Sequence, residues 1–130
     1  MPKYRFDFDK LANKVLNEIG EILVKQAKDN MDEISYGRVY KVGGRIHIAS
    51  KPGDTANNMS GALKDTIRFK IYGKVLEFGA GNEKINYAKF LEIGTSKMDK
   101  RPNYTKSIFQ NKRKIDEKVL KLFEESIRYV

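Results

Sequence analysis

Apolar side chains recur along the first part of the chain at helical spacing. They stand three and four positions apart, as on one face of a helix: Phe8, Leu11, Ala12, Val15, Leu16, Ile19, Ile22 and Leu23. This spacing predicts a helix from about Phe8 to Met31. Asp7 or Asp9 can cap its start, because a short acceptor side chain satisfies free N–H groups of the first turn. Gly20 costs about 1 kcal/mol relative to alanine, so we expect a close packing neighbour there.

The middle of the chain changes to the alternating pattern of strands, and two hairpins are predicted. In "GRVYKVGGRIHIAS", two β-prone runs flank Gly43-Gly44, and paired glycines supply the positive φ angles of a two-residue turn. In "TIRFKIYGKVLEFG", Gly73-Lys74 matches the Gly-X pattern of a type II′ turn. In the first hairpin the pattern places Val39, Ile46 and Ile48 on one face and Tyr40, Val42 and His47 on the other. In the second, Ile67, Phe69 and Ile71 share a face with Leu76 and Phe78.

The remaining segments predict loops and a second long helix. Residues 51–60 are rich in loop formers, and Asn58 or Ser60 can cap a single turn through Leu63. The run from Tyr87 to Ile93 fits a short helix or an irregular strand, and the pattern does not choose between them. Helical spacing returns near the C-terminus at Ile108, Ile115, Val119, Leu122, Phe123 and Ile127, with a cap near Asn103 or Thr105.

Helix, two hairpins, loop and helix make an α+β arrangement. We expect one antiparallel sheet of about four strands, packed by the long N- and C-terminal helices. The 130 residues suit a single domain, 1–130, since no linker or internal repeat is visible.

Composition narrows the range of functions. The chain contains no cysteine, which excludes disulfides, thiolate metal sites and thiol nucleophiles. No segment approaches the roughly 20 apolar residues that span a bilayer, and no signal-like apolar run follows the N-terminus. We therefore expect no membrane partner and synthesis in the cytosol.

The net charge of +9 is concentrated in the second half of the chain. Residues 97–114 carry seven basic side chains against Asp99 alone: Lys97, Lys100, Arg101, Lys106, Lys112, Arg113 and Lys114. Such a cluster can approach phosphate groups or an acidic protein face. An ordinary solvated surface is the other interpretation of the same residues.

The sequence gives little support for a catalytic site. His47 is the only histidine, which argues against a catalytic triad or a transition-metal site. The carboxylates Asp54, Asp65, Glu77 and Glu92 are scattered, without the spacing of an acid/base pair. Gly79-Ala80-Gly81 lacks the third glycine of a dinucleotide loop and is interpreted as a turn. We therefore expect no enzymatic activity and no cofactor. Tyr104 and Phe109 stand among cations, a weak sign of base stacking.

One stretch is distinctive in its order. In "YAKFLEIGTSKMDKRP", an aromatic-Ala pair precedes an apolar-Glu-apolar-Gly-Thr-Ser run, then a methionine and a proline. These features fall on Tyr87-Ala88, Leu91 to Ser96, Met98 and Pro102. This order resembles the signature of a family of bacteriophage neck proteins, the head–tail joining or tail-completion proteins of long-tailed phages. The family is described as gene-product-ten-like and is distantly similar to minor tail protein Z. Ser60-Gly61-Ala62-Leu63 looks like the Thr-Gly-x-Leu segment of that family.

The resemblance runs from about Ser50 to the C-terminus, with two departures. Asn103-Tyr104 stands where the family often has an aromatic-Leu pair, and the residues between Met98 and Pro102 are more basic here. Both departures concern the details of partner contact.

The resemblance implies a structural protein of the virion, assembled in the host cytoplasm, that forms a ring at the head–tail junction. Its expected partners are other copies of itself, the adjoining connector and tail-tube or tail-terminator proteins, and DNA passing through the lumen. The segment expected to bind subunits or partners is Gly94, Thr95, Ser96, Lys97, Met98, Lys100, Arg101 and Pro102.

Each residue type in this segment suits docking. The backbone is flexible at Gly94 and conformationally restricted at Pro102, so the loop can leave one subunit and lie across the next. Met98 is unbranched and adapts to an imperfect pocket. Thr95 and Ser96 can anchor the base of the loop through backbone hydrogen bonds.

The basic side chains add a further contact and an alternative function. Lys106, Lys112, Arg113 and Lys114 are candidates for contact with DNA or an acidic partner. The alternative is a cytosolic nucleic-acid-binding protein that uses residues 97–114.

Overall fold

The computed structural model describes residues 4–6, 9–37, 39–57, 61–85, 87–97 and 99–129. Its elements are β1 (Tyr4–Phe6), α1 (Asp9–Asp32), β2 (Val39–Val42), β3 (Arg45–Ile48), the 3₁₀ turn η1 (Lys64–Thr66), β4 (Arg68–Tyr72), β5 (Val75–Gly79), α2 (Ala88–Ile93), α3 (Tyr104–Gln110), α4 (Lys112–Ser126) and β6 (Ile127–Tyr129). The predicted mixture of helices and strands is confirmed. Several residues singled out in the sequence lie outside the described ranges, namely Asp7, Phe8, Asn58, Ser60 and Met98.

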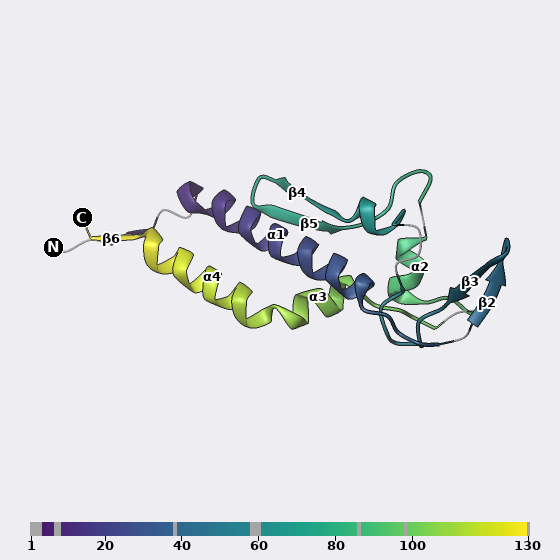
Figure 1. Ribbon diagram of the computed structural model, residues 1–130. Coiled ribbons are helices and arrows are strands. Elements are labelled where there is room, and N and C mark those ends of the chain that lie inside the picture. The colour runs from purple at the N-terminus through teal and green to yellow at the C-terminus, as the bar shows by residue number, and fades with distance from the viewer. Residues whose placement is uncertain are drawn as a thin grey trace.

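Helix α1 is the central element, and two layers pack against it. The β4–β5 hairpin lies along one side of α1, and α3 and α4 lie along the other (Figure 1). The close neighbour expected at Gly20 is the ring of Phe69 on β4, because a Cβ atom added at Gly20 would overlap that ring. Glycine is therefore what lets the hairpin approach the helix.

The prediction of a single four-stranded sheet is wrong. The described strands form three separate two-stranded antiparallel sheets, β1–β6, β2–β3 and β4–β5. Both predicted hairpins are present with the predicted turns: φ is positive at Gly43 and Gly44, and at Gly73 in the second turn. They remain apart because β4–β5 packs its Phe69 and Phe78 face toward α1, whereas β2–β3 extends from the far end of the molecule (Figure 1).

The predicted long C-terminal helix is interrupted at Asn111, where α3 ends and α4 begins. The buried side chain of Asn111 donates from Nδ2 to the carbonyl oxygen of Ser107 at 2.9 Å. Asn103 occupies the position before α3, but its side chain does not cap the helix. It donates instead to the carbonyl oxygen of Ala27 on α1 at 3.0 Å. The predicted helix start at Asn103 is therefore confirmed, but the capping hydrogen bonds do not come from its side chain.

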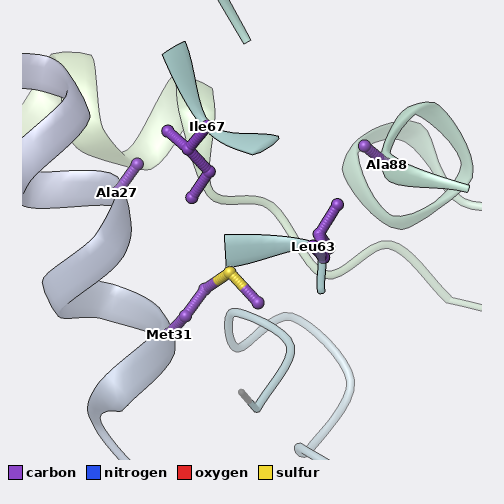
Figure 2. Packing of buried hydrophobic residues seen from close by; sticks show 5 residues of the cluster. All are labelled: Ala27, Met31, Leu63, Ile67 and Ala88. Carbon is purple, nitrogen blue, oxygen red and sulfur yellow. The ribbon is translucent and has the colours of Figure 1, made fainter. Parts of the chain in front are cut away.

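The main cluster of buried hydrophobic residues lies where α1, the start of β4 and α2 meet, and Ala12, Ile19 and Leu23 are also buried nearer the start of α1. Figure 2 shows its buried members, Ala27, Met31, Leu63, Ile67 and Ala88. Partly buried side chains complete it: Val24, Phe78, Ala80, Ile85, Leu91 and Tyr104. Two of the five buried residues are alanines, so much of the packing depends on close approach of the backbones. The core directly supports α2, which leads into the 94–102 loop.

Candidate functional site

The segment that the sequence left open between helix and strand is the helix α2, and its two sides differ. Ala88 is buried in the core and Leu91 is partly buried. On the opposite side Tyr87, Phe90 and Ile93 are exposed, with Ile93 64% accessible. These three residues are spaced three apart, so they form one ridge along the helix. The ridge points away from the core and ends where the 94–102 loop begins.

The 94–102 loop starts with an exposed section. Gly94 ends α2 with φ of 77° and donates its N–H to the carbonyl oxygen of Phe90 at 2.8 Å. Thr95 Oγ1 accepts the N–H of Lys97 at 3.2 Å, so the hydroxyl shapes the turn. The side chains of Thr95, Ser96 and Lys97 are exposed. The tip therefore presents small polar groups and a lysine cation to solvent.

The second half of the loop is fastened to residues 50–55. The Lys100 carbonyl oxygen accepts the N–H of Gly53 at 2.9 Å. The Pro102 carbonyl oxygen accepts a hydrogen bond from Thr55 Oγ1 at 2.9 Å. Arg101 turns inward, and its Nε donates to Ser50 Oγ at 3.0 Å. Of the loop cations described, Lys97 and Lys100 face solvent and Arg101 serves as an internal anchor.

Glu92 is the residue that sequence reasoning missed. Its carboxylate accepts the backbone N–H groups of Asn103, Tyr104 and Thr105, at distances from 2.6 to 3.2 Å for Oε1. These are free donors of the first turn of α3, which a helix needs to have satisfied. Glu92 thus caps α3 from α2 and holds both ends of the loop together. Burial, with the nearby Glu92 charge, raises the pKa of Tyr104 to about 12.

A buried polar network joins α1 to α3 and was also not foreseen. Its members are Gln26, Asn30, Asn103, Ser107, Gln110 and Asn111. Asn30 Nδ2 donates to Gln110 Oε1 at 2.9 Å, to Asn103 Oδ1 at 3.1 Å and to Ser107 Oγ at 3.2 Å. All six side chains are amides or a hydroxyl, so the network offers no acid or base. Its effect is to fix the position of α3, and with it the end of the loop.

The seven basic residues do not form one continuous patch. Lys106 is half-buried on α3, whereas Lys112 and Arg113 lie on the first turn of α4. Lys112 pairs with Asp116 and Arg113 with Glu117, each at 3.2 Å. Lys114 is exposed. The cationic character of the 94–102 loop is therefore separate from that of α4, which is locally balanced by acids.

Comparisons of this chain with family models, curated proteins and solved structures found no match. Within the described ranges, no group of three His, Cys, Asp or Glu side chains converges as metal ligands would. No helix in the described part of the chain is long and apolar enough to cross a membrane. The most developed site is thus the α2 ridge together with the 94–102 loop.

Proposed function

We propose that this chain is a structural assembly protein of a long-tailed bacteriophage or prophage, acting in tail completion or head–tail joining at the neck. The observation that carries the proposal is the exposed ridge of Tyr87, Phe90 and Ile93, continuing directly into the exposed Lys97 and Lys100. Tyr87 and Ile93 of this surface belong to the stretch that resembles the neck-protein signature, and Lys100 belongs to the more basic segment in which the chain departs from it.

The way in which the loop is held favours docking. A segment already fixed in one conformation loses less conformational entropy when it binds, which leaves more of the contact energy as affinity. The inward anchors at Arg101 and Glu92 provide this rigidity, and the apolar ridge provides area to bury. Lys97 and Lys100 suit an acidic rim on an adjoining connector or tail protein. The proposed role needs no catalysis and no cofactor.

The amount of exposed surface supports a role as a subunit of an assembly. A monomeric protein of 15.0 kDa is expected to expose about 7,000 Å². This chain exposes 9450 Å², including many large apolar side chains. A ring subunit has two different lateral faces in addition to its contacts along the ring axis. The proposed partners are other copies of the chain and the neighbouring connector, tail-tube or tail-terminator proteins, within a virion assembled in the host cytoplasm.

The test is complementation of an inducible phage from which this gene has been deleted. We expect filled heads beside detached or over-long tails in negative-stain micrographs. The Lys97→Glu/Lys100→Glu variant should fail to restore infectious particles while remaining folded. Arg101 is left unchanged because its side chain holds Ser50. The matched control reverses two charges on α4, Arg113→Glu and Lys114→Glu, and should restore joining. Intact infectious particles from the deleted phage would refute the proposal.

The alternative is nucleic-acid binding through residues 97–114, which the net charge of +9 favours. The ion pairs of Lys112 and Arg113 reduce the number of cations ready to meet phosphate. Under this alternative, DNA affinity of low micromolar strength falls steeply with salt, because each phosphate contact releases counterions. Such a salt dependence, together with intact particles after gene deletion, would replace the neck assignment by this one.

A further inference from the structure

The β2–β3 hairpin projects from one end of the molecule (Figure 1). Its extensive contacts among the described elements are those between its own two strands. The strand pairing places Val39 opposite Ile48 and Lys41 opposite Ile46, so these side chains share one face. On this face Val39 is 60% and Ile46 is 68% exposed. A two-stranded hairpin alone is only marginally stable in water, so this one gains from a surface on another molecule.

The base of the hairpin is nevertheless firmly held. Asn57 Nδ2 donates to the carbonyl oxygens of Ser35 and Ile48, each at 2.8 Å. Its Oδ1 accepts the N–H of Ser35 at 2.8 Å, and Gly37 N–H donates to Ala49 O at 2.8 Å. These bonds join the two sides of the hairpin stem to the following loop. The hairpin is thus an arm with a fixed direction, a property that favours specific docking.

The outer side of α4 has the complementary chemistry. Val119, Leu120 and Phe123 are exposed there, with Leu120 57% accessible. Glu124 is exposed one helical turn after Leu120, whereas Asp116, one turn before it, already pairs with Lys112 at 3.2 Å. On the apolar face of the hairpin, Lys41 is exposed and lies opposite Ile46. Apolar area and opposite charge therefore match between the two surfaces.

Other surfaces of the chain fit the hairpin less well. The α2 ridge is apolar, but it borders Lys97 and Lys100, which would face the hairpin with like charge. The hairpin also projects from one end of the molecule, whereas the exposed part of α4 lies toward the opposite end, near the termini (Figure 1). A hairpin therefore reaches this face on another copy and not on its own.

We propose that the β2–β3 hairpin of one copy docks, through Val39 and Ile46, on the Val119–Leu120–Phe123 face of α4 in a second copy. Lys41 of the hairpin meets Glu124 at the edge of this contact. The two surfaces differ, so the contact is head-to-tail, the kind that closes into a ring or continues as a filament. The inference rests on the proposed function, because it supplies the lateral contact of the neck ring and leaves the 94–102 loop for the adjoining proteins. A standard interface buries about 800 Å² per partner, well within the surplus surface of this chain.

Cysteine trapping tests the contact directly, because the chain contains no cysteine of its own. One full-length chain carries Ile46→Cys and the other carries Leu120→Cys, and the two are mixed under mild oxidation. We expect a disulfide-linked mixed dimer, whose joined positions are read by mass spectrometry. The matched control replaces Leu120→Cys by Phe90→Cys, an exposed apolar position on the α2 ridge. The first pair should give about tenfold or more product than the control, as a specific contact worth 1.4 kcal/mol would. Equal yields, or no product from either pair, would overturn the inference.

A charge exchange provides an independent readout. Lys41→Glu should lower the trapping yield of the first pair by about tenfold, and Glu124→Lys on the other chain should restore it. If neither change alters the trapping yield, the electrostatic part of the inference is refuted. The outcome is separable from the proposed function. If the cysteines are trapped but deletion of the gene leaves the phage intact, the contact is retained and the neck role is refuted. If deletion abolishes joining but the cysteines are not trapped, the neck role is retained and the contact is refuted.

Discussion

Glu92 connects α2 to α3, and its removal tests whether this connection stabilises the protein. Its carboxylate accepts three consecutive backbone N–H groups, from Asn103 to Thr105. Loss of a helix cap costs about 0.5–2 kcal/mol, and a hydrogen bond to a charged group contributes about 1.5–3 kcal/mol. Because the site is only half-buried, water can replace part of the loss. We therefore expect Glu92→Ala to lower the free energy of unfolding by about 2–3 kcal/mol.

The assay is urea unfolding followed by far-UV circular dichroism. Glu92→Gln should cost about 1 kcal/mol, because the amide oxygen still accepts hydrogen bonds but carries no charge. Glu83→Ala is the matched control: this carboxylate is exposed in the preceding loop, and its loss should change stability by less than about 0.5 kcal/mol. Amide hydrogen exchange at Asn103, Tyr104 and Thr105 should accelerate in Glu92→Ala alone. An unchanged urea midpoint together with unchanged exchange would refute the assignment of Glu92 as the cap.

Three further changes test the packing. Gly20→Ala should destabilise the protein by about 1–2 kcal/mol despite a gain of about 1 kcal/mol in helix propensity, because the added Cβ overlaps Phe69. The sign should reverse in a Phe69→Ala background, and stabilisation by Gly20→Ala alone would contradict the observed packing. Asn30→Ala should cost about 2–3 kcal/mol in urea unfolding, since buried acceptors on Asn103 and Ser107 lose their donor; a change below about 0.5 kcal/mol would argue against the network. The raised pKa of Tyr104 means that the folded state retains a proton that the unfolded state releases above pH 10. Stability should therefore decline from about pH 10 toward pH 12, and Tyr104→Phe should weaken this decline in thermal melts across that range.

Local features of the fold were predictable from the sequence. Helix α1 was expected over 8–31 and is found at Asp9–Asp32, because its apolar spacing is regular along its whole length. Both hairpins follow from their glycine turns, which leave few other conformations at Gly43-Gly44 and Gly73. The close approach at Gly20 also follows from local reasoning, since a glycine inside a helix suggests a packing partner.

Long-range features were not predictable. Nothing in the β2–β3 sequence distinguishes a hairpin that joins a sheet from one that projects, because both carry alternating apolar residues. Glu92 resembles any surface carboxylate until the fold brings α3 to it. The amides of Asn30, Asn103 and Asn111 likewise resemble surface residues, since the network joins positions more than seventy residues apart. The break at Asn111 follows from that network more than from local propensity.

The polar network also determines how the α1–α3 contact responds to temperature. Separating apolar surfaces raises the heat capacity, whereas exposing amides and hydroxyls lowers it. Release of α3 from Asn30 exposes amides and a hydroxyl together with the apolar ring of Tyr104, so the two contributions to the heat capacity oppose each other and its net change is small. Hydrophobic contacts such as those of the α2 ridge weaken on cooling. The attachment that positions the 94–102 loop therefore depends less on temperature than the apolar α2 ridge, whose contact with a partner strengthens on warming.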